Sequence, residues 1–216
     1  MDKEYKTVLN HAVYEIDEKK SRFIASVKPV STEDEAIRFI NDLKSKYWDA
    51  THNVYAYYIG GINIIQRFSD DGEPSGTAGL PVLEVIKRME VRDLVVVVTR
   101  YFGGTLLGAS GLIRAYGKSA SLGIEAAQIV RRKLCREITV ILEYTLLGKV
   151  QSLLVSKGFL IKDVIYEQDV KITVFIPEDE VEAFINFITE TTNAKAIVEM
   201  GQKTYVTLDL QGKVIK

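Results

Sequence analysis

Residues 99–120 (TRYFGGTLLGASGLIRAYGKSA) combine glycine, basic and aromatic residues directly after a run of valines, a composition found in several phosphate-handling motifs. A P-loop requires G-x-x-x-x-G-K-[ST], but Leu112 stands where the first glycine must precede the Gly-Lys-Ser of residues 117–119. The dinucleotide fingerprint G-x-G-x-x-G fails because the glycines at 103–104 are adjacent. The nucleophile elbow G-x-S-x-G fails because residues 108–111 read Gly-Ala-Ser-Gly. These three chemistries are excluded by spacing.

What remains in this segment is a buried strand, a glycine turn and the N-terminus of a helix, where free backbone N–H groups favour anions. The backbone candidates for such an anion turn are Gly103, Gly104, Gly108 and Gly111. Basic and aromatic side chains nearby can bind nucleic acid or a partner protein. The candidate residues for this surface are Arg22, Arg100, Tyr101, Arg114, Tyr116 and Lys118. In the alternative interpretation, the glycines permit tight packing, the aromatic rings fill the core and the basic residues are solvated.

An acidic loop precedes the next expected helix. It consists of Asp70, Asp71, Glu73, Pro74, Ser75, Gly76 and Thr77, with a glycine at 72. Three carboxylates in four residues repel phosphate, so this loop is not expected to hold a nucleotide unaided. It can bind Mg²⁺ or a basic partner, cap the helix, or pair with Arg100 and Arg114 within the fold. We predict neither a metal site nor a cofactor.

Catalytic alternatives rest on few residues. A small hydrolase or phosphate-handling enzyme would use His52 with Asp70, Asp71 and Ser75, but nothing in their spacing requires such a site. We therefore assign no catalytic residue and expect a binding protein rather than an enzyme. The single cysteine, Cys135, lies in a β pattern and is expected to be a buried apolar residue.

The first half of the chain predicts a mixed α/β domain. Apolar and polar residues alternate over 7–16 and 22–30, as in half-buried strands. Thr32 and Glu35 form a T-x-x-E capping box before a helix with one apolar face. Further elements are expected as follows: strands 53–59 and 62–68 joined by a two-residue turn at Gly60-Gly61, a helix 81–89, a strand 94–99 buried on both faces, and a helix 108–127.

The second half predicts a separate domain. Its patterns read strand, helix, strand, strand, helix, strand, and the order βαββαβ suggests a ferredoxin-like α/β sandwich. We place the domains at 1–132 and 133–216, an α+β class of fold.

Composition excludes several classes of protein. The net charge is −1 in 216 residues, and neither half is strongly basic, so no DNA specificity is expected. No apolar run is long enough to span a membrane, the N-terminus lacks the pattern of a signal peptide, and one cysteine excludes an internal disulfide. We expect a cytoplasmic protein without a membrane partner.

Four segments together resemble the signature of the IMPACT/YigZ family. They are SRFIA at 21–25, HNVYAY at 52–57, RFSDDGEPSGTAGLP at 67–81, and VVVVTRYFGG with the LG and GLIRAY that follow it at 95–116. The resemblance covers roughly residues 15–127 and implies the α/β sandwich of the second domain of a small-subunit ribosomal protein and of domain IV of elongation factor G. The second half is similar to the fifth domain of that factor. Ala109-Ser110 departs from the Ala-Gly or Thr-Gly of many relatives.

The resemblance also bears on function. Eukaryotic relatives are linked to translational control, which implies that partners of this chain include RNA, the ribosome or a translation-associated protein. We therefore expect a non-enzymatic regulatory or accessory protein, with the small hydrolase as the alternative.

Overall fold

The computed structural model describes residues 2–61 and 63–215, which divide into two compact units. The first unit comprises the chain through Arg131 together with Asp209–Lys213, and the second comprises Arg132–Leu208 with the residues from Val214 onward. Residues 209–213, which the sequence assigns to the second domain, thus group with the first unit. No helix in the described residues has the length and apolar character needed to cross a membrane.

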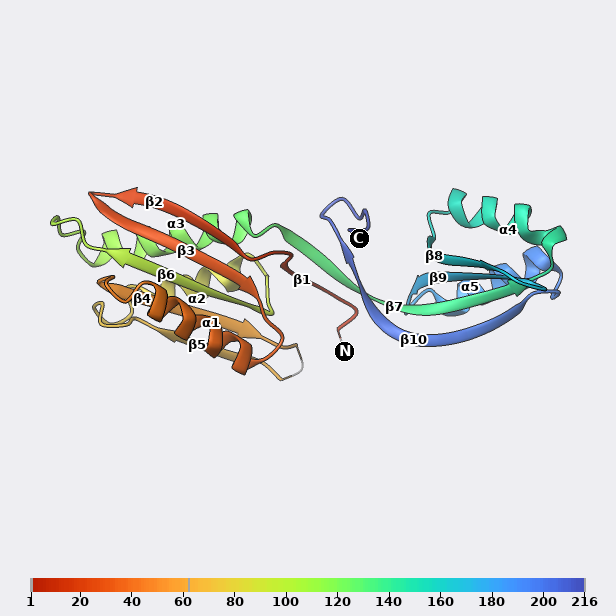
Figure 1. Cartoon of the computed structure of the whole chain (residues 1–216), viewed down its shortest axis with the longest axis horizontal. Helices are drawn as coiled ribbons and strands as arrows, with labels where there is room; N and C mark the ends of the chain where they lie inside the picture. The colour runs from red at the N-terminus through yellow and green to blue at the C-terminus, as the bar shows by residue number, and fades with distance from the viewer. Residues whose placement is uncertain (1, 62, 216) are drawn as a thin grey trace. The chain divides into compact units, whose positions relative to one another are not determined.

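The first unit is built on an antiparallel sheet with the strand order β2-β3-β6-β4-β5 (Figure 1). The strands are β2 (Ala12–Glu18), β3 (Ser21–Pro29), β4 (His52–Ile59), β5 (Ile65–Ser69) and β6 (Leu94–Tyr101). The short strand β1 (Glu4–Val8) precedes them, so the single strand expected over 7–16 is interrupted. The interruption arises because Leu9 N–H donates to the carbonyl of Gln128, 2.9 Å away.

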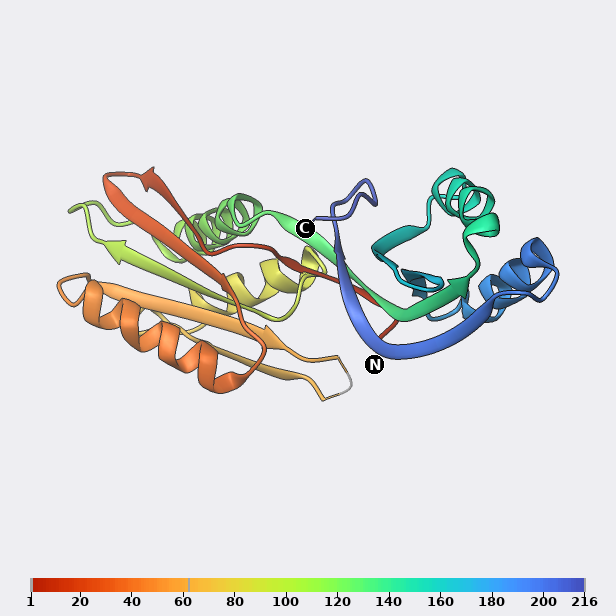
Figure 2. The ribbon, with the colours of Figure 1, turned by 45° about the vertical axis from the view of Figure 1, so that its right-hand side comes forward.

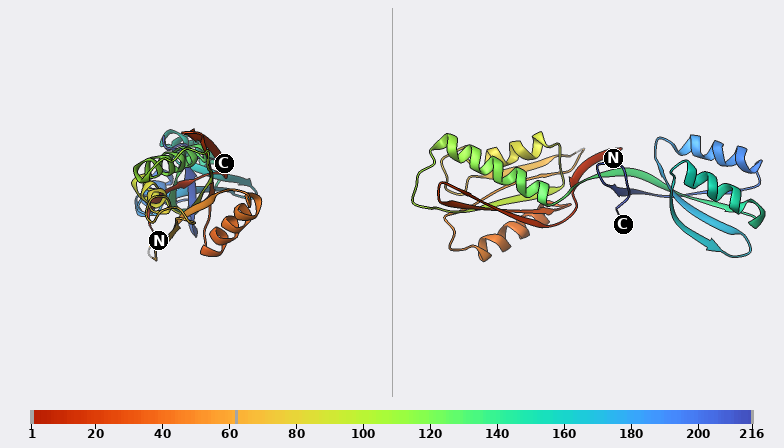
Figure 3. Two further views of the ribbon diagram at one scale, coloured as in Figure 1. Left: turned by 90° about the vertical axis from the view of Figure 1, so that its left-hand side faces the viewer. Right: turned by 90° about the horizontal axis from the view of Figure 1, so that it is seen from above.

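Helices cover both faces of this sheet. The helix α1 (Glu33–Lys46) lies on one face, and α2 (Gly79–Arg88) and α3 (Ala109–Ala126) lie on the other (Figure 3). In the central strand β6, Val96 and Val98 pack in the core under α2 and α3, whereas Val95 and Val97 pack under α1. This two-sided burial explains the unbroken run of valines and confirms the strand expected to be buried on both faces.

The local sequence correctly predicts the start of α1 but not the turn after β4. The capping box is formed as expected, with Glu35 N–H donating to Thr32 Oγ1 and Ser31 N–H donating to the Glu35 carboxylate. The expected two-residue hairpin turn is absent, because β5 begins only at Ile65; Ile62 lies outside the described residues. Gly60 instead has φ of +88° and donates its N–H to Asp93 Oδ1, so the loop is held by a residue distant in sequence.

The second unit has the βαββαβ order, which confirms the ferredoxin-like expectation. Its elements are β7 (Ile129–Leu142), α4 (Tyr144–Ser156), β8 (Leu160–Tyr166), β9 (Val170–Pro177), α5 (Val181–Thr192) and β10 (Ile197–Leu208). The strands β7, β9 and β8 pair in that order, and β10 also pairs with β7 (Figure 2). The strand β1 of the first unit also pairs with β7. Residues 129–131 of β7 belong to that first unit. Both helices cover one face of the sheet, over a core that includes Ile138, Leu154 and Phe184.

Candidate functional site

The first carboxylate of the acidic loop forms the start of α2. Asp70 Oδ1 accepts from the N–H groups of Ala78 (3.1 Å) and Gly79 (2.8 Å), and its Oδ2 accepts from the N–H of Gly76 (2.9 Å). A carboxylate at this position also opposes the positive end of the helix dipole. Asp70 is therefore occupied by helix capping. It explains why α2 begins at Gly79, two residues before the Pro81 expected to open it.

The second carboxylate ties the loop to α1 and β4. Asp71 Oδ1 accepts from Lys44 Nζ at 2.7 Å, and Oδ2 accepts from the backbone N–H of Asn53 at 2.6 Å. Its own backbone has φ of +47°, and its carbonyl oxygen lies 2.8 Å from Nδ1 of His52. A carbonyl oxygen can only accept, so Nδ1 of His52 carries the proton in this contact.

The third carboxylate, Glu73, is the centre of a buried network. Its Oε1 accepts from Arg100 Nη1 at 2.6 Å and from the hydroxyl of Tyr116 at 2.7 Å. Arg100 Nη2 donates to Ser21 Oγ at 3.2 Å, and the guanidinium lies over the rings of Phe23 and Phe102. Burial raises the pKa of the Tyr116 hydroxyl strongly, and the negative charge of Glu73 raises it further. The network therefore keeps Tyr116 protonated and joins β3, β6 and α3 to the acidic loop.

His52 approaches the free side of the same carboxylate. Its Nε2 lies 3.8 Å from Glu73 Oε2, which is an ion-pair distance and too long for a hydrogen bond. Among the described residues no hydrogen bond joins His52 to Asp70 or Ser75, and Ser75 is exposed. The residues of the alternative hydrolase are thus not brought into a triad: His52 faces Glu73 instead.

The candidate binding residues divide into an exposed and a buried group. Arg100 is only 5% exposed and Tyr116 is fully buried, so neither lies on the surface on which the sequence suggested them. The physical reason is that Glu73, from a distant loop, supplies the charge and the acceptor that both need in the core. Arg22 is exposed, forms a bidentate pair with Glu15, and lies over the ring of Tyr101.

The exposed basic candidates lie on α3 beside the turn between β2 and β3. Arg114 and Lys118 line a hollow of about 190 Å³ with Lys19, and Glu18 lines it as well. Leu107, Gly111 and Ala115 form its apolar wall. Lys19 and Lys20 form the tight turn, with φ of +47° and +69°.

We call Lys19, Lys20, Arg114 and Lys118 the basic cluster. None of these four side chains has an ion pair or hydrogen bond to another residue in the described parts of the chain. Sequence reasoning missed Lys19 and Lys20. The available signal was the basic run at 19–22 (KKSR), which overlaps the start of the first segment of the family signature.

The glycines of the 103–111 segment pack the loop and shape the start of α3. A Cβ at Gly103 would overlap the carbonyl oxygen of Lys20, so only glycine permits this close approach. Gly104 and Gly108 have φ of +81° and +72° and open space beside them, and Gly111 lies against the side chain of Leu107. The helix begins at Ala109 without a side-chain cap.

A second hollow, which we call the apolar pocket, opens on the other side of Leu107. Its volume is about 440 Å³, within the range of small-ligand sites. Phe102 (46% exposed) and Leu106 (83% exposed) stand at its walls. The lining residues are Thr51, His52, Gly72, Glu73, Pro74, Arg100, Phe102, Leu106, Leu107, Gly108, Ala109 and Leu112.

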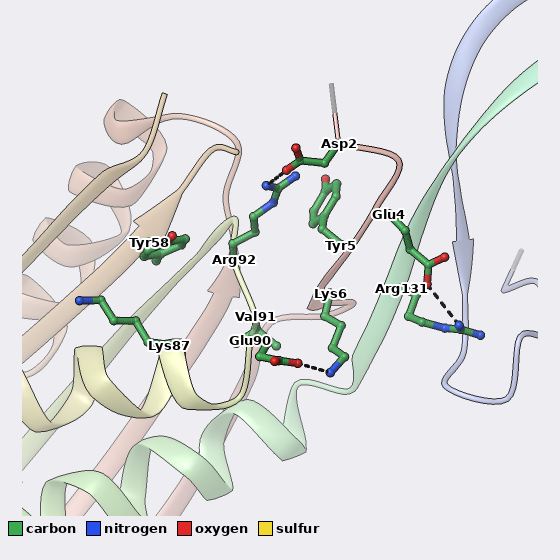
Figure 4. Close-up of a pocket in the computed structure, with 10 residues that line it drawn as sticks. All are labelled: Asp2, Glu4, Tyr5, Lys6, Tyr58, Lys87, Glu90, Val91, Arg92 and Arg131. Carbon is green, nitrogen blue, oxygen red and sulfur yellow. Dashed lines mark hydrogen bonds and ion pairs between the residues drawn. The ribbon is translucent and has the colours of Figure 1, made fainter. Parts of the chain in front are cut away.

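A third hollow of about 520 Å³ surrounds β1 and the end of α2 (Figure 4). Six of its charged side chains are paired with one another: Asp2 with Arg92, Lys6 with Glu90, and Glu4 with Arg131. The Arg92 guanidinium also lies 3.9 Å from the ring centre of Tyr5. These mutual contacts hold β1 in place and leave little charge for a ligand.

Metal ligands do not gather in the described residues: no group of three or more His, Cys, Asp or Glu side chains is placed to hold an ion there. Cys135 is buried, as expected.

Comparison with known proteins points to one family over both units. The model described as the Impact N-terminal domain matches residues 19–124, and a domain of unknown function matches 140–195. The chain is 48% identical over 202 residues to the IMPACT family member YvyE of Bacillus subtilis, covering 94% of this chain and 93% of that protein. It is 34% identical over 168 residues to the IMPACT family member YigZ of Escherichia coli, covering 77% and 82%. A crystal structure described as that of a hypothetical protein is similar with a TM-score of 0.60 at 28% identity, covering 92% of this chain and 97% of that one.

Proposed function

Because this chain belongs to the IMPACT family, we propose that it is a non-enzymatic accessory protein of the cytoplasm whose first unit binds RNA of the translation machinery. The observation that carries the proposal is the basic cluster. Three cationic side chains, Lys19, Arg114 and Lys118, line one hollow without a partner among the described residues, and Lys20 follows Lys19 in the turn, although the chain as a whole has a net charge of −1.

Unpaired basic groups are costly to collect in one place, because like charges repel. Phosphate groups relieve that repulsion, and contacts between Lys or Arg and phosphates supply most of the affinity in RNA binding that does not depend on sequence. The cluster contacts a few phosphates at most, so moderate, salt-sensitive binding is expected. The neighbouring apolar pocket adds the exposed ring of Phe102, on which an unpaired base can stack.

RNA is favoured over a protein partner by the charge of this surface. The basic cluster has one neighbouring carboxylate, Glu18, in its hollow. The enzyme alternative receives less support, because Asp70 is used in helix capping and Ser75 has no contact with His52 among the described residues.

The test is cosedimentation with ribosomes, together with binding to a labelled single-stranded RNA, at 50 and 200 mM salt. With three or four phosphate contacts, affinity is expected to fall about 20- to 50-fold between these concentrations. The double variant Arg114→Gln/Lys118→Gln should weaken binding and reduce the slope of log K against log salt by about 1.4.

The matched control is Lys87→Gln/Arg88→Gln, which removes one lysine and one arginine from exposed positions of α2 in the same unit. It should bind as the unmodified protein does. An equal loss of RNA affinity in both double variants would mean that binding depends on net charge and not on the basic cluster, which would contradict the proposal. Binding that is absent or insensitive to salt in the unmodified chain would contradict the proposal.

A further inference from the structure

The apolar pocket and the basic cluster share a wall. Leu107 lines both hollows. Along α3, Ala109 lines the apolar pocket, and Arg114 lines the basic hollow five residues later, a rise of about 7.5 Å. A strand whose phosphate is held by Arg114 and Lys118 therefore has a neighbouring base within reach of the apolar pocket.

The polar groups that line the pocket include two hydrogen-bond acceptors without a donor, beside Arg100, whose Nε has no hydrogen-bond partner among the described residues. Because Nδ1 of His52 donates to the carbonyl of Asp71, Nε2 is an acceptor when the ring is neutral. Glu73 uses Oε1 for Arg100 and Tyr116, whereas no hydrogen bond among the described residues reaches Oε2.

These two acceptors lie 3.8 Å apart, and the Glu73 side chain is only 3% exposed. One amino group can donate to both, since N–H···acceptor distances are about 2.9 Å. A buried acceptor that lacks a donor is costly, so a ligand that supplies one gains affinity.

From these contacts we propose that the apolar pocket binds an unpaired base of single-stranded RNA through its exocyclic amino group. The base stacks on Phe102, and its amino group donates to Glu73 Oε2 and His52 Nε2. Adenine and cytosine carry such a group, whereas uracil presents a carbonyl oxygen in its place. This inference rests on the proposed RNA binding and adds a base preference to it.

The experiment measures fluorescence anisotropy with ten-nucleotide homopolymers of A, C and U at pH 8. The full chain should bind the A and C oligomers about tenfold more tightly than the U oligomer. A ten-nucleotide oligomer of purine riboside, whose base keeps the purine ring but lacks the amino group, should bind about as weakly as the U oligomer. This comparison needs no protein variant and so does not depend on the folding of one.

Two variants locate the preference. Phe102→Ala should weaken all oligomers by a similar factor of about ten, because stacking is insensitive to base identity. His52→Leu, checked for folding by circular dichroism, should reduce the preference for A over U with little loss on U, because Glu73 Oε2 remains as the second acceptor.

The two proposals fail in different ways. If the A, C, U and purine riboside oligomers bind equally and with salt dependence, the base pocket is overturned while RNA binding stands. If none of them binds, both proposals are overturned.

Discussion

Replacing Arg100 by leucine leaves the carboxylate of Glu73 buried without its counter-charge. Both side chains are almost fully buried, and Nη1 lies 2.6 Å from Oε1. Removing one partner of such a pair typically destabilises a protein by 3–5 kcal/mol, mainly because the other charge remains desolvated. We expect Arg100→Leu to lower the free energy of unfolding of the first unit by about 3–5 kcal/mol, or its Tm by roughly 10–15 °C.

A double-mutant cycle separates the pair from the loss of packing. Glu73→Leu combined with Arg100→Leu leaves neither charge buried, so the double variant should be more stable than Arg100→Leu by about 1–3 kcal/mol. The cycle is measured in a Tyr116→Phe background, so that the tyrosine hydroxyl is not left without its acceptor.

The assay is urea unfolding followed by circular dichroism, with hydrogen exchange to assign each transition to a unit, because two units need not unfold together. The control is Lys87→Gln, which breaks the exposed pair with Glu84 and should cost less than about 1 kcal/mol. An Arg100→Leu variant within 1 kcal/mol of the unmodified protein would refute the reasoning that the pair is a buried structural charge.

Two further predictions concern charge and glycine packing. Hydrogen bonds from Arg136 and Lys203 lower the pKa of Glu178 to about 2. The stability advantage of the unmodified chain over Glu178→Gln should be complete above about pH 4.5 and be lost as the pH falls through about 2; an advantage that persists undiminished below that pH would exclude this linkage. Gly148→Ala should raise the stability of α4 by about 0.5–1 kcal/mol, because no atom lies within 4 Å of the new methyl group. Gly123→Ala should instead cost about 1–3 kcal/mol, since its methyl group would lie 2.8 Å from Cβ of Ala25, and a urea midpoint that moves opposite to the expected direction would contradict the prediction for that variant.

The sequence predicts those parts of the fold whose causes are local. The valines of β6 read as a strand covered on both faces, and Thr32 and Glu35 read as a helix start, because period and capping depend only on near neighbours. The βαββαβ order of the second unit follows from six well-separated patterns in the same way. The length of the turn between β4 and β5 does not, because Asp93, 33 residues later, holds Gly60 in a longer loop.

The site was harder to predict because its charges are satisfied over long distances in sequence. For Arg100 and Tyr116 the sequence left both a binding surface and the core open, and it did not identify their shared partner Glu73, which is 27 and 43 residues away. For the acidic loop the sequence left a metal site, a basic partner, helix capping and pairing with Arg100 open, and the structure shows capping by Asp70 and pairing of Glu73 with Arg100. Residue types limit which groups can pair in a core, but the partners are chosen only by tertiary packing.

Glu73 connects the architecture to the proposed base preference, because its two oxygens have different surroundings. Arg100 and Tyr116 both donate hydrogen bonds to Glu73. In Glu73→Gln, these two donors should therefore hold the amide oxygen of the glutamine, which leaves its amide nitrogen facing the apolar pocket. The pocket then presents a donor where it had an acceptor. The base preference should therefore reverse, with the U oligomer binding more tightly than the A oligomer, because uracil O4 accepts a hydrogen bond.

The reversal is measured by the same anisotropy titrations, and hydrogen exchange of the first unit checks that the variant folds. Loss of stability alone would weaken both oligomers together, whereas a changed contact moves them in opposite directions. If folded Glu73→Gln keeps the preference of the unmodified chain for A, then Glu73 Oε2 does not contact the base. In that case the buried carboxylate serves only to hold β3, β6 and α3 together.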